Sequence, residues 1–463
     1  MMKIRKILAL LCASATLAFV SCDDDKSIGL PPTPPIPSVD VSIKSQTGSF
    51  EVVQGKTLTL VGVVDAADMP VGTVYAWTVD GITQSSSDTV LNFSNPVSGE
   101  YTVTFSASNE YGTSIATEKI KVRGKYANGV FILNEGSIST EVGSLIHIDA
   151  DGDITASVGM EINGKDFGIT SQHMFIGNGK VYVVSKSTDS EHLRRVVVLD
   201  LETLKEVADY TEDLNAANLG ACDNIAALSN EIFLAAQDGI YSFNTATKAV
   251  TKIKNGTVSM MRMHASKGKL FAVSGQYVKV FEQGKDTIST QINFGAAIRS
   301  IAHSGDGNIY VAFANEIKKL NTGDYSIMET STLSTGTIAA GGTWSAAHQS
   351  ISAKGDTVYF YSSTSSPSIF MHIFSQNKTN LIANITPFLP YSMNYGGIAI
   401  SPKTGNVYVS TIGSYAGYKT DNAITVIKFE KGAAPGANAI KHIEDYIGYT
   451  RFAAGIYLPE NYE

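Results

Sequence analysis

Short stretches in which apolar and polar residues alternate dominate this chain, and one of them recurs. In Gly307-Asn308-Ile309-Tyr310-Val311-Ala312, a turn precedes an alternating strand with an aromatic residue near its start. The pattern occurs seven times, every 38 to 51 residues, centred on Phe131, Tyr182, Phe233, Phe271, Tyr310, Tyr359 and Tyr408. Period-two alternation predicts strands, and a repeat of this length made only of short strands is typical of β-propeller blades. We therefore predict a seven-bladed β-propeller over residues 126–463.

Each repeat is predicted to contain four strands, which in the fifth repeat are residues 298–302, 309–313, 316–320 and 326–330. The first strands are rich in small residues, as at 344–347 in the sixth repeat, which suits strands crowded around a central channel. The repeat at Phe131 lacks a first strand, whereas the C-terminal stretch 451–458 belongs to no repeat. We therefore predict that the C-terminal strand completes the first blade, so that the ring closes without free blade edges.

A second unit of short alternating strands covers residues 39–123. Val74-Tyr75-Ala76-Trp77-Thr78-Val79 ends at Asp80-Gly81, a strong turn pair, and about 85 residues of such strands predict a small Ig-like β-sandwich. The fold class is therefore all-β, a sandwich followed by a propeller. The central tryptophan, Gly99-Glu100-Tyr101-Thr102-Val103 and Ala107-Ser108-Asn109-Glu110-Tyr111-Gly112 resemble PKD-like modules. That resemblance implies a spacer with Trp77 in its core.

The first 38 residues have the composition of a targeting signal and a tether. Three basic residues precede an apolar run from Ile7 to Val20 that is too short to span a membrane, which predicts a signal peptide over 1–21. Leu17-Ala18-Phe19-Val20-Ser21-Cys22 resembles a lipobox, which implies lipidation at Cys22; an ordinary secretory signal is the alternative. Asp23-Asp24-Asp25 resembles the export signal of Bacteroidota surface lipoproteins, or else is a flexible acidic spacer. Five prolines within 31–37 predict a semi-rigid tether over 22–38. We therefore expect a lipid-anchored protein at the surface of the outer membrane.

Charge and cysteine content exclude several classes of function. Loss of 1–21 removes three positive charges, so the net charge moves from −8 to −11, and nucleic acid is not an expected partner. Only Cys22 and Cys222 then remain, which excludes a disulfide framework. Cys222 has no basic residue close to it in sequence and is expected to be an inert core thiol.

The sequence contains only weak signals for a metal site. The acidic run from Asp149 to Asp153 looks like a calcium loop, but Ile154 stands where an EF-hand needs Gly and Met160 where it needs Glu, which favours a hairpin turn. No two histidines have metal-ligand spacing. His264 and His303 each lie seven residues before a repeat aromatic, which predicts a shared structural position, with ligand contact as the alternative. We predict no catalytic residue, metal or cofactor.

Sorting the loops by propeller face gives a candidate binding site. Loops that lead into first strands and loops between second and third strands share one rim. That rim is predicted to present Asn134, Glu135, Gln172, Arg262, Arg299, Trp344, Tyr361, Tyr391, Tyr395, Tyr415 and Arg451. Planar side chains and guanidinium groups around a concave mouth suit a large, flat, polar ligand. The alternative is that these are ordinary loop tyrosines, or aromatics packed between blades.

The opening of the propeller carries a family resemblance. Gly129-Val130-Phe131-Ile132-Leu133-Asn134-Glu135-Gly136, Gly143-Ser144-Leu145 and the closing Ala454-Gly455-Ile456-Tyr457 resemble the YncE-like propeller lipoproteins of Bacteroidota called DUF5074. That family is similar to the BtuG-type lipoproteins, which pass corrinoids to a TonB-dependent transporter; the PKD-like module is a departure from the BtuG layout. The resemblance implies capture of a corrinoid or other tetrapyrrole and no enzymatic activity. The alternatives are a surface protein that binds glycans or other proteins and, third, a lactonase- or lyase-type enzyme.

Overall fold

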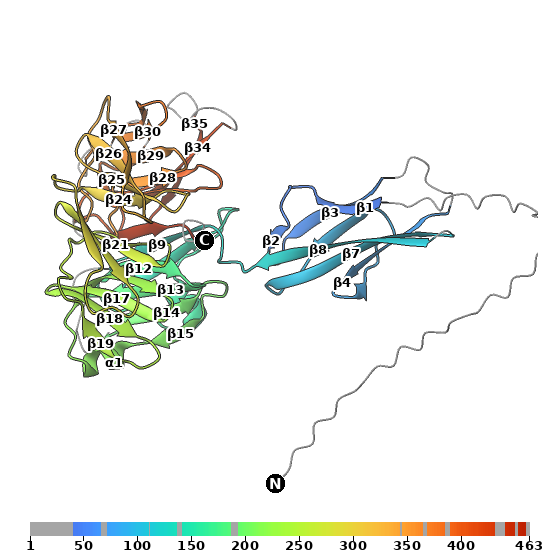
Figure 1. The fold of residues 1–463 in the computed structure, drawn as a ribbon, viewed down its shortest axis with the longest axis horizontal. Coiled ribbons are helices and arrows are strands. Elements are labelled where there is room, and N and C mark those ends of the chain that lie inside the picture. Colours follow the sequence, from blue (N-terminus) through green and yellow to red (C-terminus); the bar gives the residue numbers. More distant parts are fainter. Residues whose placement is uncertain are drawn as a thin grey trace, which may run out of the picture.

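The structure is a computed structural model that describes residues 40–65, 72–110, 112–136, 141–186, 193–342, 345–363, 368–384, 389–430, 440–449 and 452–459. In these ranges the chain is built almost entirely from β-strands, as predicted (Figure 1). The expected signal peptide (1–21), the tether with Cys22, and the candidate ligand residues Trp344 and Arg451 lie outside the described residues. Within the described ranges, none of the helices has the length and apolar character needed to cross a bilayer.

Residues 40–123 form two sheets. The smaller has the order β1-β3-β6 and consists of β1 (Asp40–Ser45), β3 (Thr57–Asp65) and β6 (Val90–Ser94). The larger has the order β2-β8-β7-β4-β5 and consists of β2 (Glu51–Val53), β8 (Gly112–Arg123), β7 (Gly99–Asn109), β4 (Val74–Val79) and β5 (Ile82–Thr83). One cluster of buried residues draws side chains from both sheets, so the two sheets enclose a common core.

Trp77 lies at the centre of this core. Its side chain is completely buried, its ring centroid is 4.7 Å from that of Phe105, and its indole N–H donates to the carbonyl of Asp88 at 2.8 Å. The Phe105 ring packs so closely on Gly62 that a Cβ at this glycine would lie 2.5 Å from the ring. The predicted core position of Trp77 is confirmed.

The rest of the described chain contains seven four-stranded antiparallel sheets (Figure 1). From the inside outwards, the first three consist of β36 (Ala453–Tyr457), β9 (Val130–Asn134), β10 (Ser144–Ile148) and β11 (Ile154–Thr155); β12 (Ser171–Gly177), β13 (Lys180–Ser185), β14 (Val196–Asp200) and β15 (Glu206–Asp209); and β16 (Cys222–Leu228), β17 (Glu231–Ala236), β18 (Gly239–Asn244) and β19 (Val250–Lys252). Two one-turn helices connect them, η1 (Gly159–Asn163) and α1 (Thr211–Ala216).

The remaining four sheets repeat this order of strands. They consist of β20 (His264–Ser266), β21 (Lys269–Ser274), β22 (Tyr277–Glu282) and β23 (Thr290–Asn293); β24 (Ser300–His303), β25 (Ile309–Ala312), β26 (Glu316–Leu320) and β27 (Ile327–Thr332); β28 (Ile351–Lys354), β29 (Thr357–Tyr361), β30 (Ile369–Ile373) and β31 (Lys378–Ala383); and β32 (Met393–Ile400), β33 (Val407–Ile412), β34 (Asn422–Phe429) and β35 (Ile440–Ile447). Each sequence repeat therefore contributes one sheet, with its aromatic residue on the second strand.

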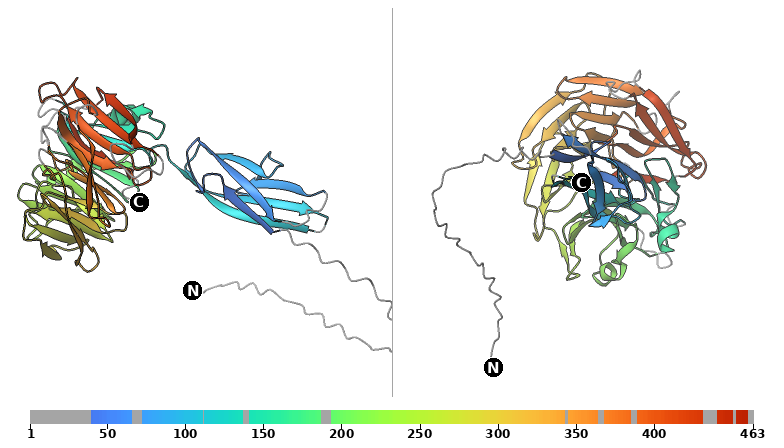
Figure 2. Two further views of the ribbon diagram at one scale, coloured as in Figure 1. Left: turned by 90° about the horizontal axis from the view of Figure 1, so that it is seen from above. Right: turned by 90° about the vertical axis from the view of Figure 1, so that its right-hand side faces the viewer.

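The innermost strands contact one another in a cycle. β36 contacts β12, and the contacts continue through β16, β20, β24, β28 and β32 back to β36. The sheets accordingly lie around a common centre (Figure 2, right). The C-terminal strand pairs with β9, with Tyr457 opposite Phe131 and Ile456 opposite Ile132, and all four side chains are buried. The predicted pairing of the C-terminus with the first repeat is confirmed.

One predicted strand is wrong. Residues 344–347 were expected to form the first strand of the sixth repeat, but that strand is β28. Residues 345–350, here called the channel segment, are buried and cross between sheets. The Ser345 hydroxyl donates to the carbonyl of Gln172 on β12 at 2.6 Å, and the carbonyl of Gln349 accepts the N–H of Ile398 on β32 at 3.1 Å. Small residues are expected both in an inner strand of a crowded ring and in a segment that fills its centre. Composition therefore could not distinguish the two, and the strand was predicted wrongly.

Candidate functional site

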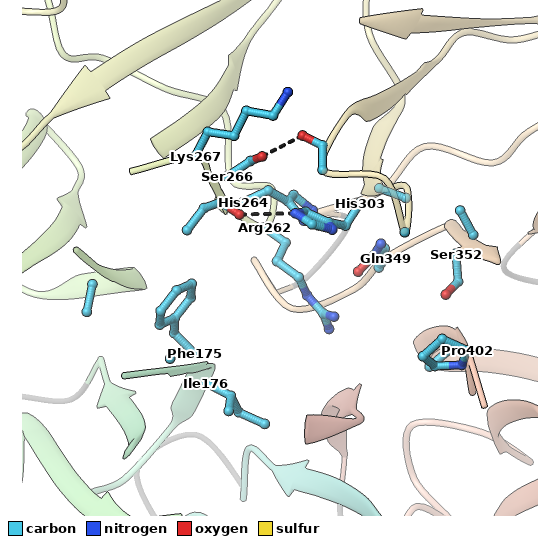
Figure 3. A pocket seen from close by; sticks show the side chains of 18 of the residues that line it. Phe175, Ile176, Arg262, His264, Ser266, Lys267, His303, Gln349, Ser352 and Pro402 are labelled. Atoms are coloured by element: carbon cyan, nitrogen blue, oxygen red, sulfur yellow. Dashed lines mark hydrogen bonds between the residues drawn. The ribbon is translucent and has the colours of Figure 1, made fainter. Parts of the chain in front are cut away.

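A cavity of about 610 Å³ lies where the innermost strands end (Figure 3). All seven of these strands contribute to its wall, from Ile176 on β12 round to Ile456 on β36, and the turns that follow several of them form its rim. Polar side chains lie among the apolar ones, including His264, His303 and Gln349. The cavity is therefore on the axis of the cycle of strands.

The cavity is at the opposite ends of the inner strands from the rim selected by sequence. The predicted rim lies where these strands begin, and there the channel segment occupies the centre. Of the predicted ligand residues that the structure describes, only Arg262 lines the cavity. The wall also contains Lys354, which sequence reasoning missed, and His264 and His303, for which ligand contact was the alternative prediction. All three lie on first strands that lead into turns. Their common place on one face was the signal that could have identified them.

Five of the predicted residues do come together at the other end. The Glu135 carboxylate accepts hydrogen bonds from the side-chain amide of Gln172 at 2.6 Å and from the hydroxyl of Tyr395 at 3.1 Å. Next to it, the Asn134 amide donates to the Ser144 hydroxyl at 3.1 Å. The Tyr395 ring lies 6.0 Å from that of Tyr415. We call Asn134, Glu135, Gln172, Tyr395 and Tyr415 the carboxyl cluster.

Glu135 is the titratable centre of the carboxyl cluster. Burial raises its pKa to about 7, although the hydrogen bonds from Tyr395 and Gln172 oppose the change. Burial, followed by the charge of Glu135, raises the pKa of Tyr395. The Tyr395 ring also packs edge-on against His348 of the channel segment, with centroids 4.5 Å apart. The cluster therefore connects the first, second and seventh sheets to the channel segment.

The other predicted residues lie elsewhere. Tyr361 is fully buried among residues of the sixth and seventh sheets, so the expectation that it faces the mouth is wrong. Tyr361 lies on the same side of β29 as Tyr359, and this side packs against residues of the seventh sheet. Arg299 donates to the carbonyl of Ile338, and Tyr391 is half-buried next to Gly413.

Arg262 lies between the cavity and the channel segment. Its Nη2 donates to the carbonyl of Ala347 at 2.9 Å and to that of Ile456 at 3.4 Å, and its guanidinium carbon lies 4.2 Å from the centroid of the Tyr457 ring. Its Nε is buried without a hydrogen-bond partner. In Figure 3 the side chain extends into the open centre of the cavity. A fixed positive charge therefore stands at the inner end of the cavity.

Three buried histidines surround this arginine. Burial is the main cause that lowers the pKa of His173, His264 and His348, and the charge of Arg262 lowers all three further. They are thus neutral at pH 7. The predicted equivalence of His264 and His303 is off by one position, because His264 pairs with Phe271 whereas Tyr310 pairs with Ala302. The turns after β20 and β24 differ in length, which shifts the spacing.

The remaining sequence candidates have structural roles. Asp149 and its neighbours form the turn between β10 and β11, where the Asp149 carboxylate accepts the backbone N–H groups of Asp151 and Asp153, both at 2.9 Å. Cys222 is buried, and burial raises its pKa to about 12. A basic partner is nevertheless present, because Arg195 Nη2 lies 3.9 Å from the sulfur. Within the described ranges, no His, Cys, Asp and Glu side chains converge as metal ligands would.

Seven sheets whose inner strands contact in a cycle, with a cavity on their axis, define a propeller-like all-β protein. The chain belongs to the DUF5074 family, a domain of unknown function, which matches residues 128–453. No curated protein matches it.

Two solved structures show similarity to this chain. A quinonprotein alcohol dehydrogenase-like protein from Bacteroides thetaiotaomicron VPI-5482 is 16% identical, with a TM-score of 0.53 over 88% of this chain and 96% of that one. A candidate 6-phosphogluconolactonase from Bacteroides fragilis NCTC 9343 is 10% identical, with a TM-score of 0.46 over 71% of this chain and 98% of that one. The likeness to the first of these, at 16% identity, concerns the fold and not the activity.

Proposed function

We propose that the seven sheets are the blades of one seven-bladed propeller, carried on a PKD-like sandwich, a tether and a lipid anchor at Cys22. The cycle of contacts among the inner strands supports the ring, and the core around Trp77 supports a self-contained spacer. This arrangement would hold the propeller outside the outer membrane.

We further propose that the propeller captures a ligand there and passes it to a TonB-dependent transporter. The observation that carries this proposal is the cavity on the propeller axis. Its volume of about 610 Å³ lies within the range of small-molecule sites, roughly 300–1,000 Å³. A large polar ligand such as a corrinoid or another tetrapyrrole could place an edge in the cavity and rest its face on the rim. The wall residues of the described structure include no carboxylate, and burial lowers the pKa of the two histidines there, His264 and His303, which makes them weak bases. Both observations favour binding over general-base catalysis.

A second candidate function is supported by the opposite face. Tyr415 and Tyr449 each keep 42% of their surface exposed there, and the Tyr418 ring stacks on Phe452 with centroids 3.9 Å apart. Exposed aromatic side chains of this kind suit the face of a sugar ring or a protein partner. A surface protein that binds glycans or proteins is therefore the alternative.

Calorimetric titration of the chain lacking residues 1–21 with cyanocobalamin and with haem tests the capture proposal. Two variants identify the face: Lys354→Trp narrows the rim of the cavity, and Tyr415→Ala removes an exposed ring from the opposite face. We expect the Lys354→Trp variant to bind the ligand more weakly than wild type and the Tyr415→Ala variant to bind it with unchanged affinity. The reverse pattern would move the ligand to the opposite face. If neither compound binds at micromolar concentration, capture of these tetrapyrroles is excluded.

A further inference from the structure

The wall of the axial cavity has a charge opposite to that of the protein. The chain carries a net charge of −8, yet the described residues that line the cavity include no Asp or Glu. They do include Arg262, Lys267 and Lys354. A hollow lined by one sign of charge, with low-dielectric walls, focuses the field and attracts ions of the opposite sign. The cavity is therefore positive within an acidic protein.

The inner end of the cavity holds two buried side-chain nitrogens that have no hydrogen-bond partner in the described structure. Arg262 is 8% exposed, and its partners are backbone carbonyls and the Tyr457 ring, none of which neutralises its charge. The Nε of Arg262 and the Nε2 of His264 are both buried without hydrogen-bond partners. A buried charge without a counter-ion is costly, and so is each buried polar atom without a partner. An oxyanion that enters the cavity would neutralise the charge of Arg262 and accept its Nε–H. It would also accept a hydrogen bond from His264 in the tautomer that carries the proton on Nε2.

The outer end supplies a second, weaker attraction. Lys267 is exposed at the turn after β20, and Lys354 is half-buried at the end of β28. Both line the same cavity as Arg262. Mobile cations at a rim attract an anion from solution, whereas a fixed guanidinium inside holds it with directed hydrogen bonds. The two ends of the cavity therefore favour the same class of ligand.

We propose that the axial cavity selects ligands that carry an oxyanion, a carboxylate or a phosphate, which binds at Arg262 and His264 after attraction by Lys267 and Lys354. This inference rests on the proposed function in that both use the same cavity, but it does not require the ligand to be a tetrapyrrole. The backbone carbonyls that hold Arg262 position its guanidinium before the ligand arrives, which reduces the entropic cost of binding.

Two pairs of probes differ in charge but little in shape. Cobyrinic acid carries carboxylates where dicyanocobinamide carries amides, and neither has the nucleotide loop and phosphodiester of cyanocobalamin. Glucose 6-phosphate adds a phosphate to glucose. We expect the anionic member of at least one pair to bind about tenfold or more tightly than the neutral one, the loss of a charge-assisted hydrogen bond being of that order. Affinity should fall as NaCl rises from about 10 to 150 mM, because the rim charges are screened.

Single substitutions test whether the cavity residues cause the preference for the anionic probe. Arg262→Gln should abolish the preference for the anion, and Lys354→Gln should reduce the affinity about two- to threefold without a core contact at risk. Lys205→Gln, at an exposed position outside the cavity, is the matched control and should have no effect. If Arg262→Gln does not fold, Lys354→Gln and the salt dependence still test the proposal.

The outcomes separate this inference from the capture proposal. If glucose 6-phosphate binds through Arg262 while cyanocobalamin and haem do not bind, anion selection stands and tetrapyrrole capture fails. If dicyanocobinamide binds as tightly as cobyrinic acid, glucose 6-phosphate binds no more tightly than glucose, and Lys354→Gln changes none of these affinities, capture stands and anion selection is overturned. Absence of binding by both anionic probes up to millimolar concentration also overturns it.

Discussion

Replacement of Glu135 by Gln should stabilise the protein at neutral pH. The carboxyl is buried between Gln172 and Tyr395, and burial raises its pKa from 4.5 to about 7. The folded state therefore favours the protonated acid more strongly than the unfolded state does. Stability linked to this group is fully present below pH 4.5 and is lost as the pH rises towards 7. Glutamine has the shape of the protonated acid and cannot ionise.

The size of the effect follows from the change in pKa. Each pKa unit corresponds to about 1.4 kcal/mol, so an increase of two to three units costs wild type about 3 kcal/mol at pH 7 and above, and about 1 kcal/mol at pH 5. Glu135→Gln avoids this cost. The stability difference between variant and wild type should therefore grow by about 2 kcal/mol between pH 5 and pH 7 and change little beyond.

Urea unfolding at a series of pH values measures this difference. The buried histidines also make stability depend on pH. Burial lowers the pKa of His147 to about 4 and that of His348 to about 3, so stability falls below pH 6.5 as they take up protons in the unfolded state. This contribution is common to both proteins and cancels in the difference. If the difference in unfolding free energy between variant and wild type stays constant from pH 5 to pH 7.5, the prediction is refuted.

Three further perturbations have definite expected outcomes. Truncation after Tyr449 removes β36 and leaves β9 with an unpaired edge and exposed apolar residues, so the protein should aggregate or lose its cooperative thermal transition; calorimetry that matches wild type would contradict the closure. Trp77→Ala should destabilise the sandwich by about 3–5 kcal/mol and leave ligand affinity unchanged, which denaturation and titration of the same sample will check. Protease added to intact cells should digest the protein, and Cys22→Ser should release it from the membrane fraction; protection until lysis would exclude surface exposure.

The repeated strand pattern allowed much of the fold to be predicted from the sequence. The alternation around Phe131, Tyr310 and the other repeat aromatics reflects strands that are buried between sheets, and such burial demands the same pattern wherever it occurs. The repeat at Phe131 lacked a first strand, and the C-terminal strand belonged to no repeat. Pairing the two was predicted because unpaired backbone groups buried in a core cost too much free energy. The core position of Trp77 was expected from the resemblance of its segment to PKD-like modules.

The candidate site depended on contacts that no local pattern records. Alternation assigned Tyr361 to one side of its strand, but only the packed sheets show that this side faces a neighbouring sheet. Arg262 precedes its strand, and only the assembled ring brings it to the axial cavity. The channel segment has the composition of an inner strand, and only its hydrogen bonds to β12 and β32 show that it occupies the centre. The sequence by itself thus determined the repeated sheets and the strand that joins their ends, because both arise from local periodicity and backbone pairing. The tertiary structure decided which end of the axis is hollow, because that depends on where a non-repeating segment packs.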